Sequence, residues 1–128
     1  IHSVDTSIHI KSNGHIISSN IIYDVSLGVF LQGSSDNIVA DNLVKDNLFT
    51  NIANNAIDIY YVLNTTIESN TIYSAKYGID GNYSNNATII SNTFDLITSQ
   101  GIYFHYYYSG PSNIESNTIN VIGGNYGI

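Results

Sequence analysis

The 128-residue sequence contains no cysteine, methionine, tryptophan or arginine. Without cysteine, the chain has neither disulfide bonds nor thiolate metal ligands. Apart from four histidines, its only basic side chains are three lysines, against ten acidic residues, which gives a net charge of −7. Nucleic acids are bound mainly through lysine and arginine, and anionic membrane surfaces attract the same side chains. We therefore expect neither nucleic acid nor a membrane as a partner.

Proline and long apolar runs are also scarce. Pro111 is the only proline, and no segment approaches the ~18 apolar residues of a membrane-spanning helix. Hydrophobic residues make up 43% of the chain and the mean hydropathy is +0.02, which predicts one domain over residues 1–128. The sequence shows no initiator methionine or signal peptide and begins and ends within a repeated pattern, so we expect it to be a fragment of a longer surface protein.

What the sequence does have is an internal repeat. An Ile-rich segment that closes on asparagine recurs every 22 to 28 residues, and a small residue followed by an aliphatic one comes later in each repeat. A period in the low twenties, with β-branched residues at alternate positions, predicts one rung of a β-solenoid. The asparagines are Asn20, Asn42, Asn70, Asn92 and Asn117, and the second phase comprises Gly28-Val29, Ala56-Ile57, Gly78-Ile79, Gly101-Ile102 and Gly127-Ile128.

Stacking of the rungs assigns structural roles to the repeated residues. Because rungs lie about 4.8 Å apart, equivalent positions of successive repeats lie above one another. Recurrent isoleucine then predicts core columns, and recurrent asparagine predicts a ladder of side-chain amides. Asp41-Asn42 is nearly duplicated as Asp46-Asn47, so we assign Asn42 to the ladder and keep Asn47 as the alternative. Residues 1–19 are expected to form an irregular first rung, and residues 20–128 the regular rungs.

On these motifs, the chain resembles the right-handed parallel β-helix repeats of the pectin-lyase-like superfamily over roughly residues 13–128. The resemblance implies an all-β fold: a right-handed parallel β-helix of about five rungs with an asparagine ladder at one turn. In composition and repeat style the chain also resembles adhesin-like and surface-layer β-helix proteins. That likeness implies an extracellular structural or adhesive segment of a cell-surface or filament-forming protein.

The register of the small-aliphatic phase predicts one face that is both polar and aromatic. In each repeat the aliphatic residue points inward, so the next residue points outward by strand alternation. Carboxylates, amides and aromatic rings on a flat face suit a carbohydrate chain. Alternatively, the tyrosines only fill a pleated surface, which they do well without any ligand. The predicted polysaccharide-binding residues are Asp58, Asp80, Tyr60, Asn82, Tyr103, His105, Tyr61, Tyr83 and Tyr106.

One segment of this face also suggests catalysis. Tyr77-Gly78-Ile79-Asp80 is similar to the Tyr-Gly-aromatic-Asp start of the catalytic motif in alginate C5-epimerases, which continues with Pro and His, whereas Gly81-Asn82 follows here. The likeness implies a polysaccharide-modifying enzyme of the uronate epimerase or lyase type that uses Asp80, His105 and Tyr77. Because the sequence offers no fuller catalytic set, we favour the structural role.

The remaining expectations concern ions, modification and partners. We expect no cofactor; a Ca²⁺ ion bridging Asp58 and Asp80 is the one alternative, although two acids are few ligands for an ion that takes six to eight oxygens. Sequons at Asn64, Asn82 and Asn86 are compatible with a glycosylated extracellular surface. The ends of a β-helix expose unpaired backbone groups, so adjoining rungs of the parent chain or stacked copies are the expected partners.

Overall fold

The computed structural model describes residues 4–105, 110–123 and 128, and its regular structure consists of β-strands in two main sheets. Within this part of the chain, no helix has the length and apolarity that crossing a membrane requires. The first sheet contains, in spatial order, β1 (Val4–Ile10), β3 (Ile21–Gln32), β6 (Leu48–Tyr60), β9 (Thr71–Asn82), β11 (Thr93–His105) and β13 (Thr118–Val121). The second contains β2 (Ile16–Ser18), β5 (Leu43–Lys45), β8 (Thr66–Glu68), β10 (Asn85–Ile90) and β12 (Gly110–Glu115), with β4 (Val39–Ala40) and β7 (Val62–Leu63) joined through β10.

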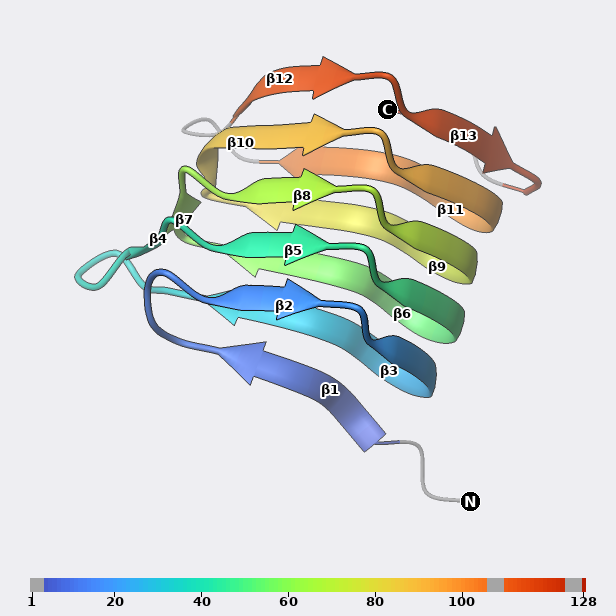
Figure 1. The fold of residues 1–128 in the computed structure, drawn as a ribbon, viewed down its shortest axis with the longest axis horizontal. Coiled ribbons are helices and arrows are strands. Elements are labelled where there is room, and N and C mark those ends of the chain that lie inside the picture. Colours follow the sequence, from blue (N-terminus) through green and yellow to red (C-terminus); the bar gives the residue numbers. More distant parts are fainter. Residues whose placement is uncertain (1–3, 106–109, 124–127) are drawn as a thin grey trace.

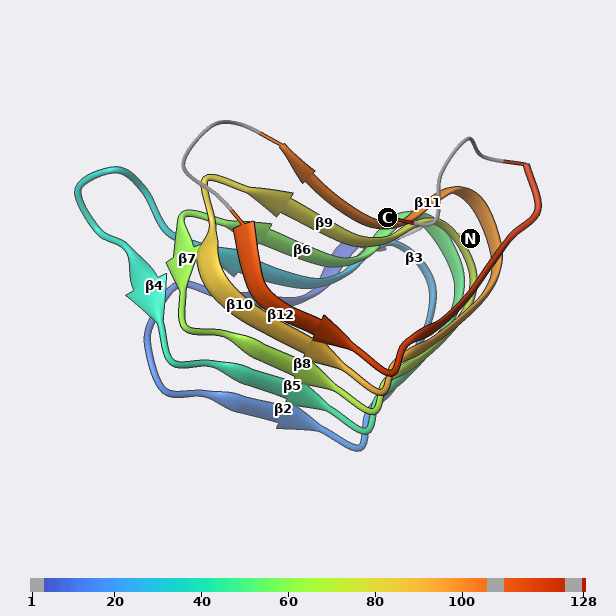
Figure 2. The ribbon, with the colours of Figure 1, turned by 90° about the horizontal axis from the view of Figure 1, so that it is seen from above.

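The strands form a parallel β-solenoid of about five turns, as the sequence predicted. All pairings between named strands are parallel, and each regular turn contributes one long strand to the first sheet and a shorter one to the second. The turns lie one above another, with β1 at one end of the stack and β12 and β13 at the other (Figure 1). Viewed from above, the two sheets enclose a narrow interior (Figure 2).

The interior is filled by columns of equivalent residues. Four of the five aliphatic residues of the repeat pair in the register that the sequence predicted and have no exposed surface, whereas the fifth, Ile128, is 68% exposed. A second column, which includes Phe49 and Phe94, fills the other half of the core. Identical apolar contacts therefore recur from turn to turn. The first column is Val29, Ile57, Ile79 and Ile102; the second is Ile22, Phe49, Ile72 and Phe94.

Two of the small residues that precede the aliphatic ones, Gly28 and Gly78, make room for these phenylalanines. A Cβ atom added to Gly78 would lie 2.3 Å from the carbonyl oxygen of Gly101 and 2.4 Å from Cδ1 of Phe94. Gly28 is confined in the same way, because its Cβ would lie 2.7 Å from Cδ1 of Phe49. At contacts this short, a side chain at either position would force the neighbouring backbone or ring to shift. At Gly28 and Gly78, the Gly-aliphatic pattern thus reflects close packing of the backbone against core aromatic rings.

An asparagine ladder runs along one corner of the solenoid. In each step, the main-chain N–H of one asparagine donates to the side-chain Oδ1 of the next, at 2.9–3.0 Å. The side-chain Nδ2 donates to the same oxygen at 3.0 Å. The ladder consists of Asn20, Asn47, Asn70, Asn92 and Asn117.

The assignment of Asn42 to this ladder was wrong. Leu48 pairs with Thr71, which places Asn47 beside Asn70. Asn42 lies at the preceding corner, where its Oδ1 accepts from the N–H of His15 at 2.8 Å. The residue before each of these two asparagines, Asp41 and Asp46, has a left-handed backbone with φ of 58° and 53°. Both corners therefore have the same local form, which is why the duplicated Asp-Asn pairs are alike.

Candidate functional site

The outward face of the second half of the first sheet carries the residues that the sequence singled out. These residues form two outward columns, and the members of each column pair in the predicted register from β3 to β11. The first outward column also extends back to β1, where His9 pairs with Phe30 and stacks on its ring, with the ring centres 4.9 Å apart. Tyr106, one of the predicted polysaccharide-binding residues, lies outside the described residues. The first outward column is Phe30, Asp58, Asp80 and Tyr103, and the second outward column is Gln32, Tyr60, Asn82 and His105.

Four side chains at the centre of this face form what we call the polar cluster: Asn55, Asp58, Asp80 and His105. The amide Nδ2 of Asn55 donates to Oδ2 of Asp58 at 2.9 Å and to Oδ2 of Asp80 at 3.2 Å. On the other side of Asp80, its Oδ1 lies 2.7 Å from Nε2 of His105. The structure therefore joins two carboxylates from adjacent turns through one amide and places an imidazole against one of them.

Asn55 was not predicted, and its position depends on an irregularity in β6. Between Ile52 and Asn55, β6 has one more residue than β9, because Ile52 pairs with Ala75 and Asn55 with Tyr77. A β-bulge of this kind redirects side chains locally. Asn55 is consequently buried, with 7% of its surface exposed, and its amide reaches the two carboxylates. The Ala53-Asn54-Asn55 segment carries no repeat signal that would reveal this extra residue.

Burial of Asp58 changes its acidity. Its pKa is raised from 3.8 to about 6, chiefly because burial penalises the charged carboxylate. The hydrogen bond from Asn55 lowers the pKa, the negative charge of Asp80 raises it, and His105 lowers it again. Asp58 is therefore a carboxyl group that exchanges its proton in mildly acidic solution, at the centre of an exposed sheet face.

Aromatic rings border the polar cluster on two sides. On one side, the ring of Tyr103 stacks against Tyr77 and His105, with centroid distances of 6.4 and 4.6 Å. Beyond Tyr77, the Nζ atom of Lys76 lies 5.1 Å from the centre of its ring. Tyr77, one of the three predicted catalytic residues, thus lies on the same face as the other two, Asp80 and His105.

The second aromatic border lies at the corner after the long strands. Tyr61 and Tyr83 stack in parallel at 4.6 Å, and Tyr60 meets both rings edge to face. The two stacked rings line a shallow groove of about 360 Å³. The groove residues are Ile38, Tyr61, Leu63, Tyr83 and Asn85.

The predicted sequons differ in their exposure and in the hydrogen bonds that they make. Asn64 and Asn86 belong to an exposed ladder of their own, in which Nδ2 of Asn86 donates to Asn64 at 2.6 Å and Nδ2 of Asn64 donates to Asp41 at 3.2 Å. Asn82 belongs to the outward face, but the hydroxyl of Ser84, the third residue of its sequon, is fully buried. That hydroxyl donates to the carbonyl oxygens of Ile59 and Asn82 at 3.2 and 2.9 Å.

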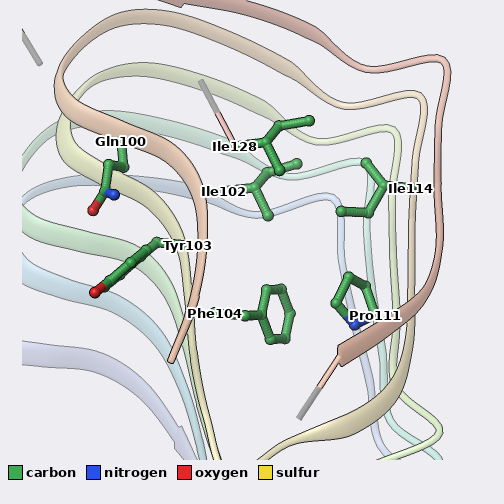
Figure 3. A pocket seen from close by; sticks show the side chains of 7 residues that line it. All are labelled: Gln100, Ile102, Tyr103, Phe104, Pro111, Ile114 and Ile128. Carbon is green, nitrogen blue, oxygen red and sulfur yellow. The ribbon is translucent and has the colours of Figure 1, made fainter. Parts of the chain in front are cut away.

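A separate hollow of about 490 Å³ opens at the end of the solenoid formed by β11 and β12. Figure 3 shows Ile102, Phe104, Ile114 and Ile128 around it, with the ring of Tyr103 directed away toward the outward face. In the described part of the chain, no group of three or more histidine, aspartate or glutamate side chains is arranged to hold a metal ion.

Comparison with known families agrees with this architecture. The family described as the right-handed beta helix region matches residues 2–128, nearly the whole chain. No curated protein and no solved structure gives a significant match. The match accounts for the repeat, the parallel stacking and the handedness that the sequence resemblance implied. The chain belongs to the right-handed β-helix family.

Proposed function

We propose that this β-helix is a structural segment of an extracellular, cell-surface protein that contacts polysaccharide through the outward face of its first sheet. The observation that carries the proposal is the polar cluster bordered by the rings of Tyr77, Tyr103, Tyr61 and Tyr83. Sugar rings have apolar faces that stack on tyrosine and hydroxyl groups that bond to carboxylates and amides. A solenoid presents such groups on rigid backbone at a regular spacing.

The rigidity of the face supports this role. The core residues beneath it, including Ile57, Ile79 and Ile102, have no exposed surface. Every strand of the face is hydrogen-bonded to the turns beside it. Because the rings are already ordered, little side-chain entropy is lost when a ligand binds. The exposed asparagines of the sequons are compatible with an extracellular location.

The test is binding to a panel of soluble neutral and uronic-acid polysaccharides, measured by isothermal titration calorimetry. Tyr103→Ala removes the ring between Tyr77 and His105, and we expect it to weaken binding at least about threefold, in line with the energy of an aromatic contact. Tyr73→Ala is the matched control, because Tyr73 is 46% exposed on the other half of the same sheet. Equal losses in both variants, or no binding by the wild-type chain to any glycan, would contradict the proposal.

The contact between Asp80 and His105 favours a second candidate, a polysaccharide-modifying enzyme of the epimerase or lyase type. Removing a proton beside a uronate carboxylate needs a base, an acid and a group that stabilises the developing negative charge. Asp80 orients the imidazole of His105 at 2.7 Å, and Tyr77 supplies a hydroxyl on the same face. His105 would then act as the base and Tyr77 as the acid.

Incubation of the chain with polyuronates in heavy water tests this candidate. Deuterium in the product would indicate an epimerase, and an unsaturated chain end would indicate a lyase. Either product should disappear in Asp80→Asn and persist in Asp36→Asn, which changes an exposed loop aspartate. If mass spectrometry finds neither product with any polyuronate, the catalytic candidate is wrong while the binding proposal stands.

A further inference from the structure

Two tyrosines lie side by side at the corner that follows the long strands. Tyr61 lies where the chain passes from β6 to β7, and Tyr83 lies one turn later, between β9 and β10 (Figure 2). The parallel register holds across this corner, because the N–H of Tyr61 donates to the carbonyl of Asn82 at 3.0 Å and Leu63 pairs with Asn85. Tyr61 and Tyr83 are therefore equivalent positions of adjacent turns.

The two rings share an orientation as well as a register. Both residues have a left-handed backbone, with φ of 51° for Tyr61 and 50° for Tyr83, so their side chains leave the main chain in the same direction. The ring planes differ by only 6° and the centroids are 4.6 Å apart. Other tyrosine pairs among the described residues meet edge to face, as Tyr60 does with both rings, or lie farther apart, as Tyr77 and Tyr103 do at 6.4 Å. Equivalent edges of Tyr61 and Tyr83 consequently lie next to one another.

The stacked pair is accessible from solvent. Tyr61 and Tyr83 are both half-buried, and both line the groove of about 360 Å³ at this corner. A groove of this kind admits small solutes to the edges of the rings and gives the rings room to tilt. The same stack inside the core would have neither property.

The composition of the chain makes tyrosine the residue for a covalent link between turns. The sequence has no cysteine, so no disulfide bond can form, but it has eleven tyrosines. Two phenol rings can be joined by one-electron oxidation. Each phenol loses one electron and one proton, and the unpaired electron of the resulting radical is shared between the oxygen and ring carbons that include Cε1 and Cε2. Radicals on two adjacent rings can then couple.

We propose that Tyr61 and Tyr83 form a site of oxidative cross-linking, at which a haem peroxidase with hydrogen peroxide joins the two rings as dityrosine. A carbon–carbon bond forms between one Cε atom of each ring. The hydrogen on each coupled carbon then moves to the oxygen of its ring as a proton and restores the phenol. In total two electrons and two protons leave the protein, and they reduce one peroxide molecule to two molecules of water.

Such a cross-link would tie two adjacent turns of the solenoid together. Its ends lie 22 residues apart in the chain, so it would restrict the unfolded chain in the way that a disulfide bond does. We expect the urea midpoint of the cross-linked chain to rise by about 1 M. This inference is independent of the polysaccharide proposal, because it rests on the mutual geometry of two rings and needs no glycan.

The experiment treats the 128-residue chain with a haem peroxidase and hydrogen peroxide at low protein concentration, which favours coupling within one molecule. Dityrosine is detected by its fluorescence, and the intact mass should fall by two hydrogen atoms for each cross-link. Trypsin, applied after unfolding, cleaves after lysine and separates Tyr61 in peptide 46–76 from Tyr83 in peptide 77–128. The proposed cross-link therefore appears in mass spectrometry as these two peptides joined.

Phenylalanine variants identify the residues that couple. Tyr61→Phe and Tyr83→Phe each keep the ring but remove the phenol that forms the radical, so both should lose the joined peptides. Tyr60→Phe is the matched control, because Tyr60 lies in the same peptide as Tyr61 and meets Tyr83 edge to face. It should give the joined peptides in the yield of the wild type. Circular dichroism confirms the fold of each variant.

We expect the joined peptides to be the main cross-linked product of the folded wild-type chain, and to decrease when the chain is oxidised in concentrated urea. The proposal is overturned if the wild-type chain gives no joined peptides, or gives them equally when unfolded. It is also overturned if they persist in Tyr61→Phe or Tyr83→Phe, or disappear in Tyr60→Phe. An unchanged urea midpoint of the cross-linked chain would refute the stabilising role.

Discussion

Replacing Asn70 by alanine tests whether the ladder stabilises the fold through its buried hydrogen bonds. Asn70 is 1% exposed and lies in the middle of the ladder. Its Oδ1 accepts from the N–H and the Nδ2 of Asn47, both at 3.0 Å. Its own Nδ2 donates to the carbonyl of Val44 at 2.9 Å and to the Oδ1 of Asn92 at 3.0 Å.

The cost follows from which groups lose every partner. In Asn70→Ala, the Nδ2 of Asn47 keeps a bond to the carbonyl of Ile17, and the Oδ1 of Asn92 keeps the N–H of residue 70. The carbonyl of Val44 keeps its place in the parallel pairing of β5 with β8, so only the N–H of Asn47 loses its single partner. Leaving a buried polar group unsatisfied costs about 1–3 kcal/mol and the lost bond to Val44 costs about 1 kcal/mol, so the free energy of unfolding should fall by about 3 kcal/mol.

Asn20→Ala is the matched control, because it removes the same side chain from the exposed end of the ladder. The Oδ1 of Asn47 would still accept from the N–H of residue 20. No buried group is orphaned, and the expected loss is about 1 kcal/mol or less.

Urea unfolding followed by far-ultraviolet circular dichroism measures both variants. With a denaturant dependence of about 2 kcal/mol per molar, Asn70→Ala should lower the midpoint by about 1.5 M and Asn20→Ala by about 0.5 M or less. The comparison requires that the denaturant dependence be the same in the wild type, in Asn70→Ala and in Asn20→Ala. If the two variants differed by less than about 1 kcal/mol, the reasoning from orphaned groups would be refuted.

Three further predictions concern the acidity of Asp58 and the packing of the glycines. Because the pKa of Asp58 is about 6 when folded and about 3.9 when unfolded, the folded state binds the extra proton between these values, so stability falls as pH rises from about 4 to 6. Asp58→Asn should remove this slope and stabilise the fold above pH 6 by up to about 3 kcal/mol, measured as melting temperature against pH; an unchanged slope would contradict the assignment. Gly78→Ala should destabilise by about 1–3 kcal/mol in urea unfolding, whereas Gly123→Ala, whose Cβ would meet nothing closer than 3.5 Å, should be near neutral; equal effects would argue against the packing constraint. Gly81→Ala would place its Cβ 2.4 Å from the ring of Phe104, so its cost in the wild type should shrink in a Phe104→Ala background, and additive losses would show that the two residues do not interact.

The register of the outward face could be predicted from the sequence. Strand alternation and the Gly-aliphatic repeat are both periodic, so aligning one residue of each turn also aligns its neighbours along the strand. Asp58, Asp80 and Tyr103 lie in one column, as predicted. The contact between Asp80 and His105 required the structure, because the two residues occupy different columns. Asn55 could not be predicted, since it depends on a one-residue register shift in β6 that the repeat does not mark.

The sequence by itself determined the fold class, the core columns and the position of the outward face. These properties depend on two periods that can be read along the chain. One is two residues within a strand, and the other is 22 to 28 residues from one turn to the next. Only the tertiary structure decided which asparagine joins the ladder. Asp41-Asn42 and Asp46-Asn47 adopt the same left-handed corner, so local sequence does not distinguish them. Pairing of Leu48 with Thr71 places Asn47, and not Asn42, against the amide of Asn70.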